Sequence, residues 1–155
     1  MEALGVIDRV KKGGWRVIDR STAQSQEEKI EIMRRALLCD TYLTGANAIS
    51  EDGEIVNVDG NGNRVAAMTF GPKSVIVACG MNKVVKTAED AISRARNTAA
   101  PVNAQRFDIR TPCKTTGSCA DCKSTDSICS YIVRTRLCKP AGRIKVVLIG
   151  EAIGF

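Results

Sequence analysis

The sequence contains no histidine among its 155 residues. This absence excludes mixed Cys/His zinc fingers and any catalysis that depends on an imidazole. Aromatic residues make up only 4% of the chain, which speaks against the base-stacking surfaces that single-strand nucleic-acid binders use. Long apolar runs are also missing, because the apolar stretches are five or six residues long and a membrane span needs about 20.

The remaining composition is typical of a soluble globular protein. Hydrophobic residues make up 44% and charged residues 26% of the sequence, both close to the usual values. A chain of this length builds one sizeable core, so residues 1–155 are expected to form a single domain. The sequence opens on a charged amphipathic segment rather than a signal peptide, which predicts a cytoplasmic protein without membrane insertion.

Positive charge is concentrated in the last third of the sequence. The net charge of +6 conceals a segment, residues 94–145, in which eleven basic residues accompany only three acids (11 − 3 = +8). A basic surface attracts phosphate, carboxylate, CoA-type nucleotides or nucleic acid. Nucleic acid is the least favoured of these partners, since aromatics are scarce and no nucleic-acid-binding motif is present.

Four cysteines lie inside this basic segment, within a stretch of 17 residues, and they are the strongest functional signal. They have the spacing C-x5-C-x2-C-x6-C and are Cys113, Cys119, Cys122 and Cys129. Thiolates favour zinc or iron–sulfur clusters, and a C-x2-C pair lets one tight turn present two sulfurs to the same centre. We therefore expect a cysteine-rich insertion at 111–130 whose four thiolates hold a metal, with the surrounding basic residues offsetting their charge.

The spacing leaves several interpretations open. It does not choose between zinc and an iron–sulfur cluster, since it matches neither the bacterial ferredoxin run nor the paired knuckles of a zinc ribbon. Two disulfides, redox-active thiols and four unrelated thiols are the alternatives. Of the other cysteines, Cys39 and Cys79 are expected to be small core residues, and Cys138 to be a spare thiol in a basic loop.

Helices and strands are predicted to alternate along the chain. Helices are expected at Ala3–Lys12 and at Ser124–Val133. A third is expected after a capping box at Ser25–Glu28, and its apolar face contains Ile30, Met33 and Leu37. A fourth is expected after the cap at Thr87, and its apolar face contains Ala91, Ile92, Ala95 and Ala99. Strands are expected at Trp15–Asp19 and Thr41–Thr44, and a hairpin that turns at Glu51–Gly53 is expected over Asn47–Val58. Two further strands are expected at the buried apolar runs Ser74–Ala78 and Lys145–Ile149. The chain is expected to continue inward over Arg64–Phe70. The alternation predicts an α/β fold with a mostly parallel sheet flanked by helices.

Residues 45–68 are rich in glycine, asparagine and aspartate. Backbone amides near residues 59–64 could converge into an anion-binding nest with Arg64 supplying charge, although neither a Walker loop nor a dinucleotide fingerprint is present. Glu51, Asp52 and Asp59 are acid/base candidates, and the simpler interpretation is a hairpin followed by a tight turn. The candidate substrate-binding residues are Gly45, Asn47, Asn57, Asp59, Gly60, Asn61, Gly62, Asn63 and Arg64.

These strings together resemble a known family, the LUD-domain (lactate-utilisation protein) family. The resemblance rests on Gly45-Ala46-Asn47-Ala48-Ile49, Asp59 to Met68, Phe70-Gly71-Pro72-Lys73, Gly80 to Val85, the Thr-Pro-Cys segment with its three further cysteines, and Gly142 to Phe155. It is closest to the short, single-domain, cysteine-containing members found in anaerobic bacteria. Members usually begin with a further helix, a strand and a Gly-Gly-Ser-like turn, and this sequence begins at the segment that follows them.

The resemblance implies a Rossmann-like domain of the ribose-5-phosphate isomerase, glucosamine-6-phosphate deaminase and CoA-transferase type, with the site near the polar loop. It also implies an accessory role in the oxidation of lactate or a similar small organic acid, with the cysteines holding a cluster or zinc. A redox partner subunit, a small anionic metabolite and a homo-oligomer are the expected partners. The alternatives are a stand-alone isomerase or CoA-transferase-like enzyme acting on a phosphorylated or CoA-linked anion, and a non-catalytic anion sensor.

Overall fold

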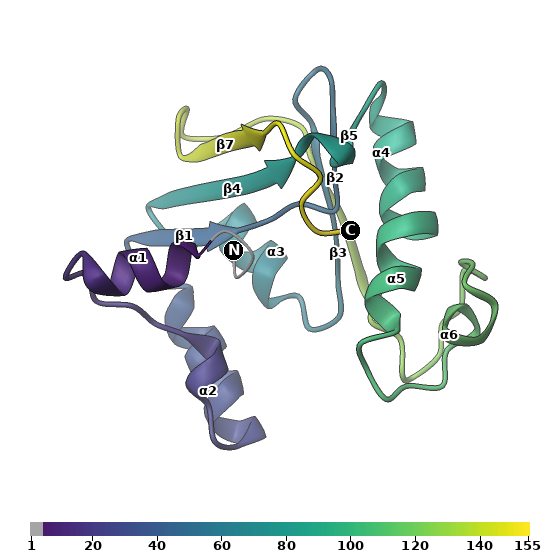
Figure 1. Ribbon diagram of the computed structural model, residues 1–155, viewed down its shortest axis with the longest axis horizontal. Coiled ribbons are helices and arrows are strands. Elements are labelled where there is room, and N and C mark those ends of the chain that lie inside the picture. Colours follow the sequence, from purple (N-terminus) through teal and green to yellow (C-terminus); the bar gives the residue numbers. More distant parts are fainter. Residues whose placement is uncertain (1–4) are drawn as a thin grey trace.

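The protein contains two β-sheets, one of three strands and one of four (Figure 1). A computed structural model describes residues 5–155. The first sheet contains β1 (Thr41–Thr44), β4 (Ser74–Gly80) and β7 (Ile144–Ile149) in the order β1-β4-β7. All its strands are parallel, with Thr41 opposite Ser74 and Val75 opposite Ile144. The predicted parallel strand at Ser74–Ala78 is therefore confirmed, and it lies at the centre of this sheet.

The second sheet is mixed and has the strand order β5-β2-β3-β6. Strands β2 (Ala48–Ser50) and β3 (Ile55–Asp59) form the predicted antiparallel hairpin. Strand β6 (Tyr131–Thr135) pairs antiparallel with β3, and the short β5 (Val84–Val85) runs parallel to β2.

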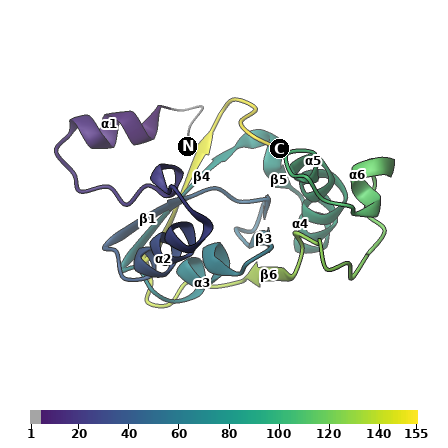
Figure 2. The same cartoon turned by 90° about the horizontal axis from the view of Figure 1, so that it is seen from below.

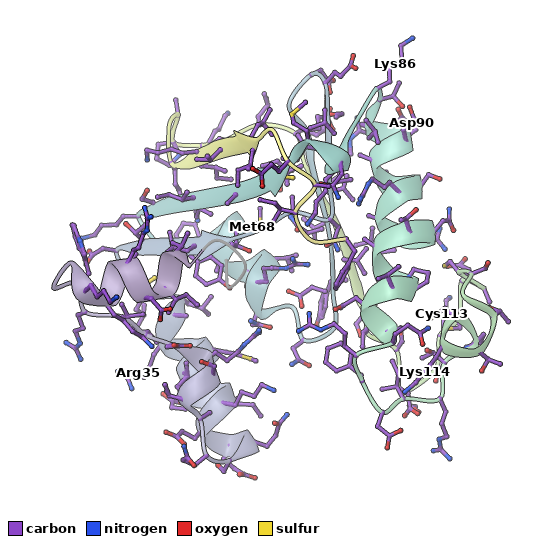
Figure 3. All side chains as sticks on the ribbon, viewed as in Figure 1. Arg35, Met68, Lys86, Asp90, Cys113 and Lys114 are labelled. Carbon is purple, nitrogen blue, oxygen red and sulfur yellow. The ribbon has the colours of Figure 1, made fainter. Side chains whose placement is uncertain are left out.

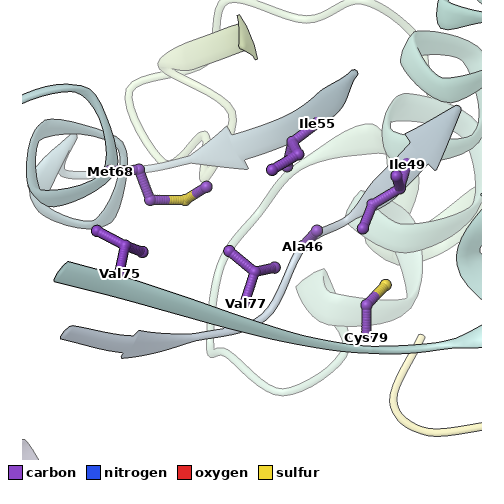
Figure 4. Close-up of a cluster of buried hydrophobic side chains, with 7 residues drawn as sticks. All are labelled: Ala46, Ile49, Ile55, Met68, Val75, Val77 and Cys79. Carbon is purple, nitrogen blue, oxygen red and sulfur yellow. The ribbon is translucent and has the colours of Figure 1, made fainter. Parts of the chain in front are cut away.

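The main core lies between the two sheets, where β4 faces β3 and helix α3 (Asn63–Thr69) (Figure 4). Val75, Val77 and Cys79 alternate along one face of β4 and are 0–1% exposed. They point toward Met68 of α3 and Ile55 of β3. The alternation of period two thus places every second residue of β4 in this core, and the prediction that Cys79 is a core residue is confirmed.

A second core lies under the long helical segment of α4 (Ala88–Arg94), η4 (Ala95–Ala99) and α5 (Ala100–Ala104). The Thr87 hydroxyl accepts from the amide of Asp90, and the Asp90 carboxylate accepts from the amide of Thr87. This capping box fixes where the helix begins. The predicted face is confirmed by three fully buried alanines, Ala91, Ala95 and Ala99, whose small side chains let the helix approach β2 and β3 closely.

The amino-terminal part is less well packed. Helix α1 (Val6–Lys12) agrees with the predicted helix, whose start at Ala3 lies outside the described residues. The predicted strand at Trp15–Asp19 is wrong, because the segment is irregular and the Trp15 side chain is 74% exposed. A strand needs a hydrogen-bonded neighbour, and among the described residues this segment pairs with none of the strands of either sheet.

A 3-10 turn, η2 (Arg20–Thr22), leads to α2 (Gln26–Ala36), which begins at the predicted Ser25 cap. The Glu28 amide donates to the Ser25 hydroxyl at 3.1 Å. However, no residue of α2 is fully buried, and Ile30 on its apolar face is 40% exposed. Figure 2 shows α1 and α2 on the opposite side of the molecule from α4, α5 and α6.

Asp19 links α1 to η2, and its carboxylate is expected to stabilise the folded protein only at pH values where it is ionised. Lys11 donates to Asp19 at 2.8 Å, and this bond, followed by those from Ser21, lowers the pKa of Asp19 from 3.8 to about 2. A carboxylate with a lowered pKa contributes stability above its unfolded pKa and loses it as the pH falls toward about 2. Asp19→Asn is expected to lower the unfolding free energy by about 0.5–1 kcal/mol at pH 6, the size of an exposed ion pair.

Urea denaturation at pH 6 and at pH 3 measures this effect, and the difference from the wild type should shrink at the lower pH. The matched control is Asp40→Asn, since Asp40 pairs with Lys73 at 3.3 Å while both side chains are more than 80% exposed. A pH-independent loss in Asp19→Asn would contradict the assignment.

Three further predictions are wrong in part. Residues 124–130 form a loop instead of a helix, and Tyr131–Thr135 form β6, because pairing with β3 outweighs the weak helical pattern. The residues of Arg64–Phe70 lie mostly in α3, and Phe70 at its end is 88% exposed. The strand at Lys145–Ile149 exists as β7, but Val146, Val147 and Leu148 are 41–51% exposed because β7 is an edge strand.

The architecture as a whole confirms the predicted fold class. A parallel sheet flanked by helices defines an α/β protein, and the arrangement is compatible with a Rossmann-like fold. Within residues 5–155, none of the helices has the length and apolar character required to cross a membrane.

Candidate metal centre

The four clustered cysteines come from three pieces of backbone at one end of the molecule. Cys113 lies in the short helix α6 (Pro112–Thr116), which begins after Thr111 with a proline in its first turn. Gly117 ends α6 with a φ of 73°, so the chain turns back and carries Cys119 and Cys122 in the loop that follows. Cys129 lies just before β6. Figure 3 shows Cys113 on α6, next to α5 and far from the three-stranded parallel sheet.

The structure brings all four of these thiols to one small cavity of about 50 Å³. Every one of the four is a free, partly buried thiol. A water molecule needs roughly 10–15 Å³ of such volume, so the space is larger than one water. The other residues around it are mostly apolar or small: Ala100, Pro101, Thr111, Ala120, Ser127, Ile128 and Ile132, with Arg96 and Asp121 at its polar side.

The thiols are close enough to influence one another's charge. Burial raises the pKa of Cys129, and negative charge on Cys113, Cys119 and Cys122 raises it further. Four thiolates would therefore repel one another in this space without a cation. Such a group is stabilised by a positively charged metal centre that replaces the protons.

Hydrogen bonds position two of the four sulfur atoms, those of Cys113 and Cys119. The Asp121 amide lies 3.5 Å from the Cys119 sulfur, and Asp121 itself has a φ of 49°, which a turn inside the C-x2-C pair requires. The Thr111 hydroxyl lies 3.3 Å from the Cys113 sulfur. The Arg96 guanidinium donates to Asp121 and also approaches the Cys119 sulfur at 3.9 Å. Bonds of this kind orient thiolate ligands and set the properties of the metal they hold.

Arg96 is a site residue that the sequence did not single out. It lies in η4, a π-helical turn between α4 and α5, directly before Pro101. Proline has no amide hydrogen and clashes with the carbonyl four residues earlier, and a π-helical turn relieves such a conflict. Pro101 was the available signal, since a proline inside a helical pattern marks an irregular turn, and this one presents Arg96 and Ala100 to the cavity.

The four cysteines at the cavity are ligands that either a single zinc ion or a larger iron–sulfur centre uses. In a structural zinc site four sulfurs lie about 2.3 Å from a single ion. Among residues 5–155 no three histidine, cysteine, aspartate or glutamate side chains are arranged in that way. The donor set itself, four cysteines with neighbouring cationic and hydroxyl groups, suits either.

The polar segment at residues 45–64 contains β2, β3 and the turn before α3, and side-chain hydrogen bonds connect its parts. Asn47 Oδ1 accepts from the Val58 amide at 2.9 Å and from Arg64 at 2.8 Å. Asp59 Oδ2 accepts from the amides of Arg64 and Val65, so it caps α3 and occupies the amides that an anion would use. Gly62 precedes α3 with a φ of 78°, and a Cβ there would lie 3.0 Å from the Tyr131 ring.

The other predicted binding residues divide between the loop and the core. Gly45 lies between β1 and β2, Gly60 packs against the Ile128 backbone, Gly60 to Gly62 form the turn, and Asn63 is the first residue of α3. Asn57 is 1% exposed in β3, and its Oδ1 atom has no hydrogen-bond partner. Glu51 and Asp52 lie in the exposed β2–β3 turn. The structure therefore joins Asn47, Asp59 and Arg64 in one network and leaves the other two acid/base candidates, Glu51 and Asp52, in the exposed turn.

Comparison of the sequence with known protein families identifies one matching family. The model of the LUD domain matches residues 1–149. Neither the curated proteins nor the solved structures gave a match. Because the match covers nearly the whole chain, this protein belongs to the LUD-domain family, whose members are associated with lactate utilisation.

Proposed function

We propose that this LUD-domain protein is a cytoplasmic accessory subunit in the oxidation of lactate or a similar small organic acid. In this role Cys113, Cys119, Cys122 and Cys129 hold an iron–sulfur cluster that passes electrons to or from a redox partner subunit. The observation that carries the proposal is that four thiols, distant by up to 16 positions in the sequence, line one cavity of about 50 Å³. The cluster would supply one-electron transfer, and the chain would supply its ligands and their surroundings.

The surroundings of the thiols suit an electron carrier. Arg96, which also pairs with Asp121, places positive charge next to the Cys119 sulfur and so lowers the cost of gathering negative charge there. The walls formed by Ala100, Pro101, Ile128 and Ile132 limit contact with water. Cys119 and Cys122 lie in a loop at the end of the molecule, so the centre is close to the surface, where a partner could accept an electron.

The proposal is tested by purifying the protein without oxygen and measuring iron, acid-labile sulfide, zinc and the visible spectrum. The wild type is expected to be coloured. Cys122→Ser is expected to contain at most about one tenth of the wild-type iron, because losing a ligand lowers metal affinity at least as much as losing an outer-shell partner does. Cys138→Ser is the matched control: this half-buried thiol lies outside the quartet and accepts from the Ile144 amide at 3.1 Å.

Two outcomes would overturn the electron-transfer role. Stoichiometric zinc in a colourless protein would make the quartet a structural brace for the loop at 111–130. A protein without metal, whose thiols all react with an alkylating reagent, would remove the metal centre altogether. Equal iron in Cys122→Ser and Cys138→Ser would show that the iron is bound elsewhere.

A second candidate function rests on Arg64, whose guanidinium donates to the Asn47 side chain at 2.8 Å and to the Val58 carbonyl at 2.6 Å. A guanidinium held in this way beside a glycine-rich turn attracts anions. An isomerase or CoA-transferase-like enzyme, or a sensor, could bind a phosphorylated or CoA-linked anion here. Calorimetric titration with CoA and with inorganic phosphate tests this candidate, and absence of binding to the wild type would reject it.

A further inference from the structure

A second basic group lies far from the cysteines, around Lys83. This lysine belongs to the short turn η3 (Met81–Lys83) and is 8% exposed. Its ammonium makes one hydrogen bond, to the Ala46 carbonyl at 3.3 Å. Within residues 5–155 no carboxylate lies within ion-pairing distance of it. An ammonium has three donors, and buried charges are normally paired, so Lys83 is buried without a counter-ion.

The groups that face Lys83 favour its neutral form. Burial lowers the pKa of Lys83, and the positive charges of Arg94 and Arg64 lower it further. Cys79 would act in the opposite direction as a thiolate, but burial raises the pKa of that thiol and keeps it protonated. A lysine buried in this way beside other cations is a nucleophile rather than a surface charge.

Arg94 provides a charged group next to this amine. Its Nε donates to the Asn82 carbonyl at 3.1 Å and its Nη1 to the Asn47 carbonyl at 2.6 Å. These bonds fix the guanidinium plane. The Nη2 atom makes no hydrogen bond to any described residue, which leaves a donor free. Guanidinium groups held in this way bind carboxylates specifically.

The carboxyl-terminal residues cover the amine. From β7 the chain runs past β5 and ends close to the second sheet (Figure 1). The Asn82 side chain holds it at two points: Nδ2 donates to the Gly154 carbonyl at 3.1 Å, and Oδ1 accepts from the Ile153 amide at 3.2 Å. A Cβ on Gly154 would lie 2.9 Å from the Lys83 nitrogen. Both bonds are exposed to solvent, so this cover is held weakly.

We propose that Lys83 is a carbonyl-binding residue for a small 2-oxo acid, which enters when residues 151–155 lift, places its carboxylate on Arg94 and condenses with the amine. The amine nitrogen attacks the carbonyl carbon, and the C=O electron pair moves to oxygen, which takes a proton from solvent. The resulting carbinolamine, whose nitrogen keeps both of its hydrogens and the positive charge, loses one water and becomes a protonated imine. No oxidant or reductant is needed. This site is separate from the cysteine quartet and does not depend on the metal.

Reductive trapping tests the proposal. The full chain is incubated with pyruvate and borohydride, which reduces an imine to a stable secondary amine, and the adduct is located by intact mass and peptide mapping. We expect one adduct, on the peptide that contains Lys83. The adduct should be absent in Lys83→Arg and unchanged in Lys86→Arg, whose side chain is exposed three residues away.

Two further comparisons test the cover and the carboxylate site. Asn82→Ala should form the adduct several-fold faster, because it releases the last residues. Acetone, which has the ketone but no carboxylate, should react at least about tenfold more slowly than pyruvate with the wild type. Peptide mapping of the wild type decides the result even if Lys83→Arg fails to fold.

Adducts spread over the surface lysines would overturn the proposal. So would the absence of any adduct on Lys83 in both the wild type and Asn82→Ala. Equal rates for acetone and pyruvate would remove Arg94 from the site.

Discussion

Replacing Arg143 with methionine is expected to lower the free energy of unfolding by about 3–5 kcal/mol. Arg143 is 8% exposed at the start of β7. Its guanidinium donates to three backbone carbonyls, those of Pro72 at 2.9 Å, Met68 at 2.6 Å and Ala67 at 2.8 Å. Methionine fills a similar volume but leaves all three carbonyls without these donors in a region that water does not reach.

Urea denaturation monitored by circular dichroism measures this loss. Lys145→Met is the matched control, since Lys145 lies two residues further along and its exposed side chain bonds Ser74 and Gly142. The control should lose less than about 1 kcal/mol. Arg143→Lys should be intermediate, because an ammonium cannot reproduce the planar fork. Equal losses in Arg143→Met and Lys145→Met would show that the three bonds contribute little.

Met68→Ala is expected to cost about 2–5 kcal/mol of unfolding free energy. The Met68 side chain is 2% exposed in the core between the two sheets, beside Val75 and Ile55. Removing it leaves a cavity between α3 and β4 that the surrounding strands fill only in part.

Phe70→Ala is the internal control for this prediction. Phe70 is larger and more hydrophobic than many core residues, yet it is 88% exposed at the end of the same helix. Its removal should change the unfolding free energy by no more than about 0.5 kcal/mol. A greater loss from Phe70→Ala than from Met68→Ala would contradict the observed orientation of α3.

The sequence predicted those elements whose signals are local. The Thr87 capping box and the alanine face of α4 are confirmed because capping and helical periodicity act within a few residues. The hairpin between β2 and β3 follows in the same way from its turn residues, and β4 from its continuous apolar run, although only every second residue of that run is fully buried. Cysteine spacing likewise selected the four thiols that line the cavity, and their role as metal ligands stays a prediction.

Errors occurred where a distant partner decided the outcome. Tyr131–Thr135 forms a strand because it pairs with β3, whereas Trp15–Asp19 pairs with no strand of either sheet. Val146 and Val147 look like core residues in sequence but lie on an edge strand. Only folding brings Arg96 beside Cys119, with Pro101 as the one indirect signal in the sequence, and only folding buries Lys83 under Gly154.

By itself, the sequence determined the α/β class, the family, the absence of imidazole chemistry and the identity of the four clustered thiols. These properties depend on composition, spacing and short-range geometry. The tertiary structure alone decided which apolar runs are buried, which residues of the polar segment are already bonded to one another, and that the four thiols line one cavity. Burial and convergence depend on contacts between residues far apart in the chain, and local patterns do not encode those contacts.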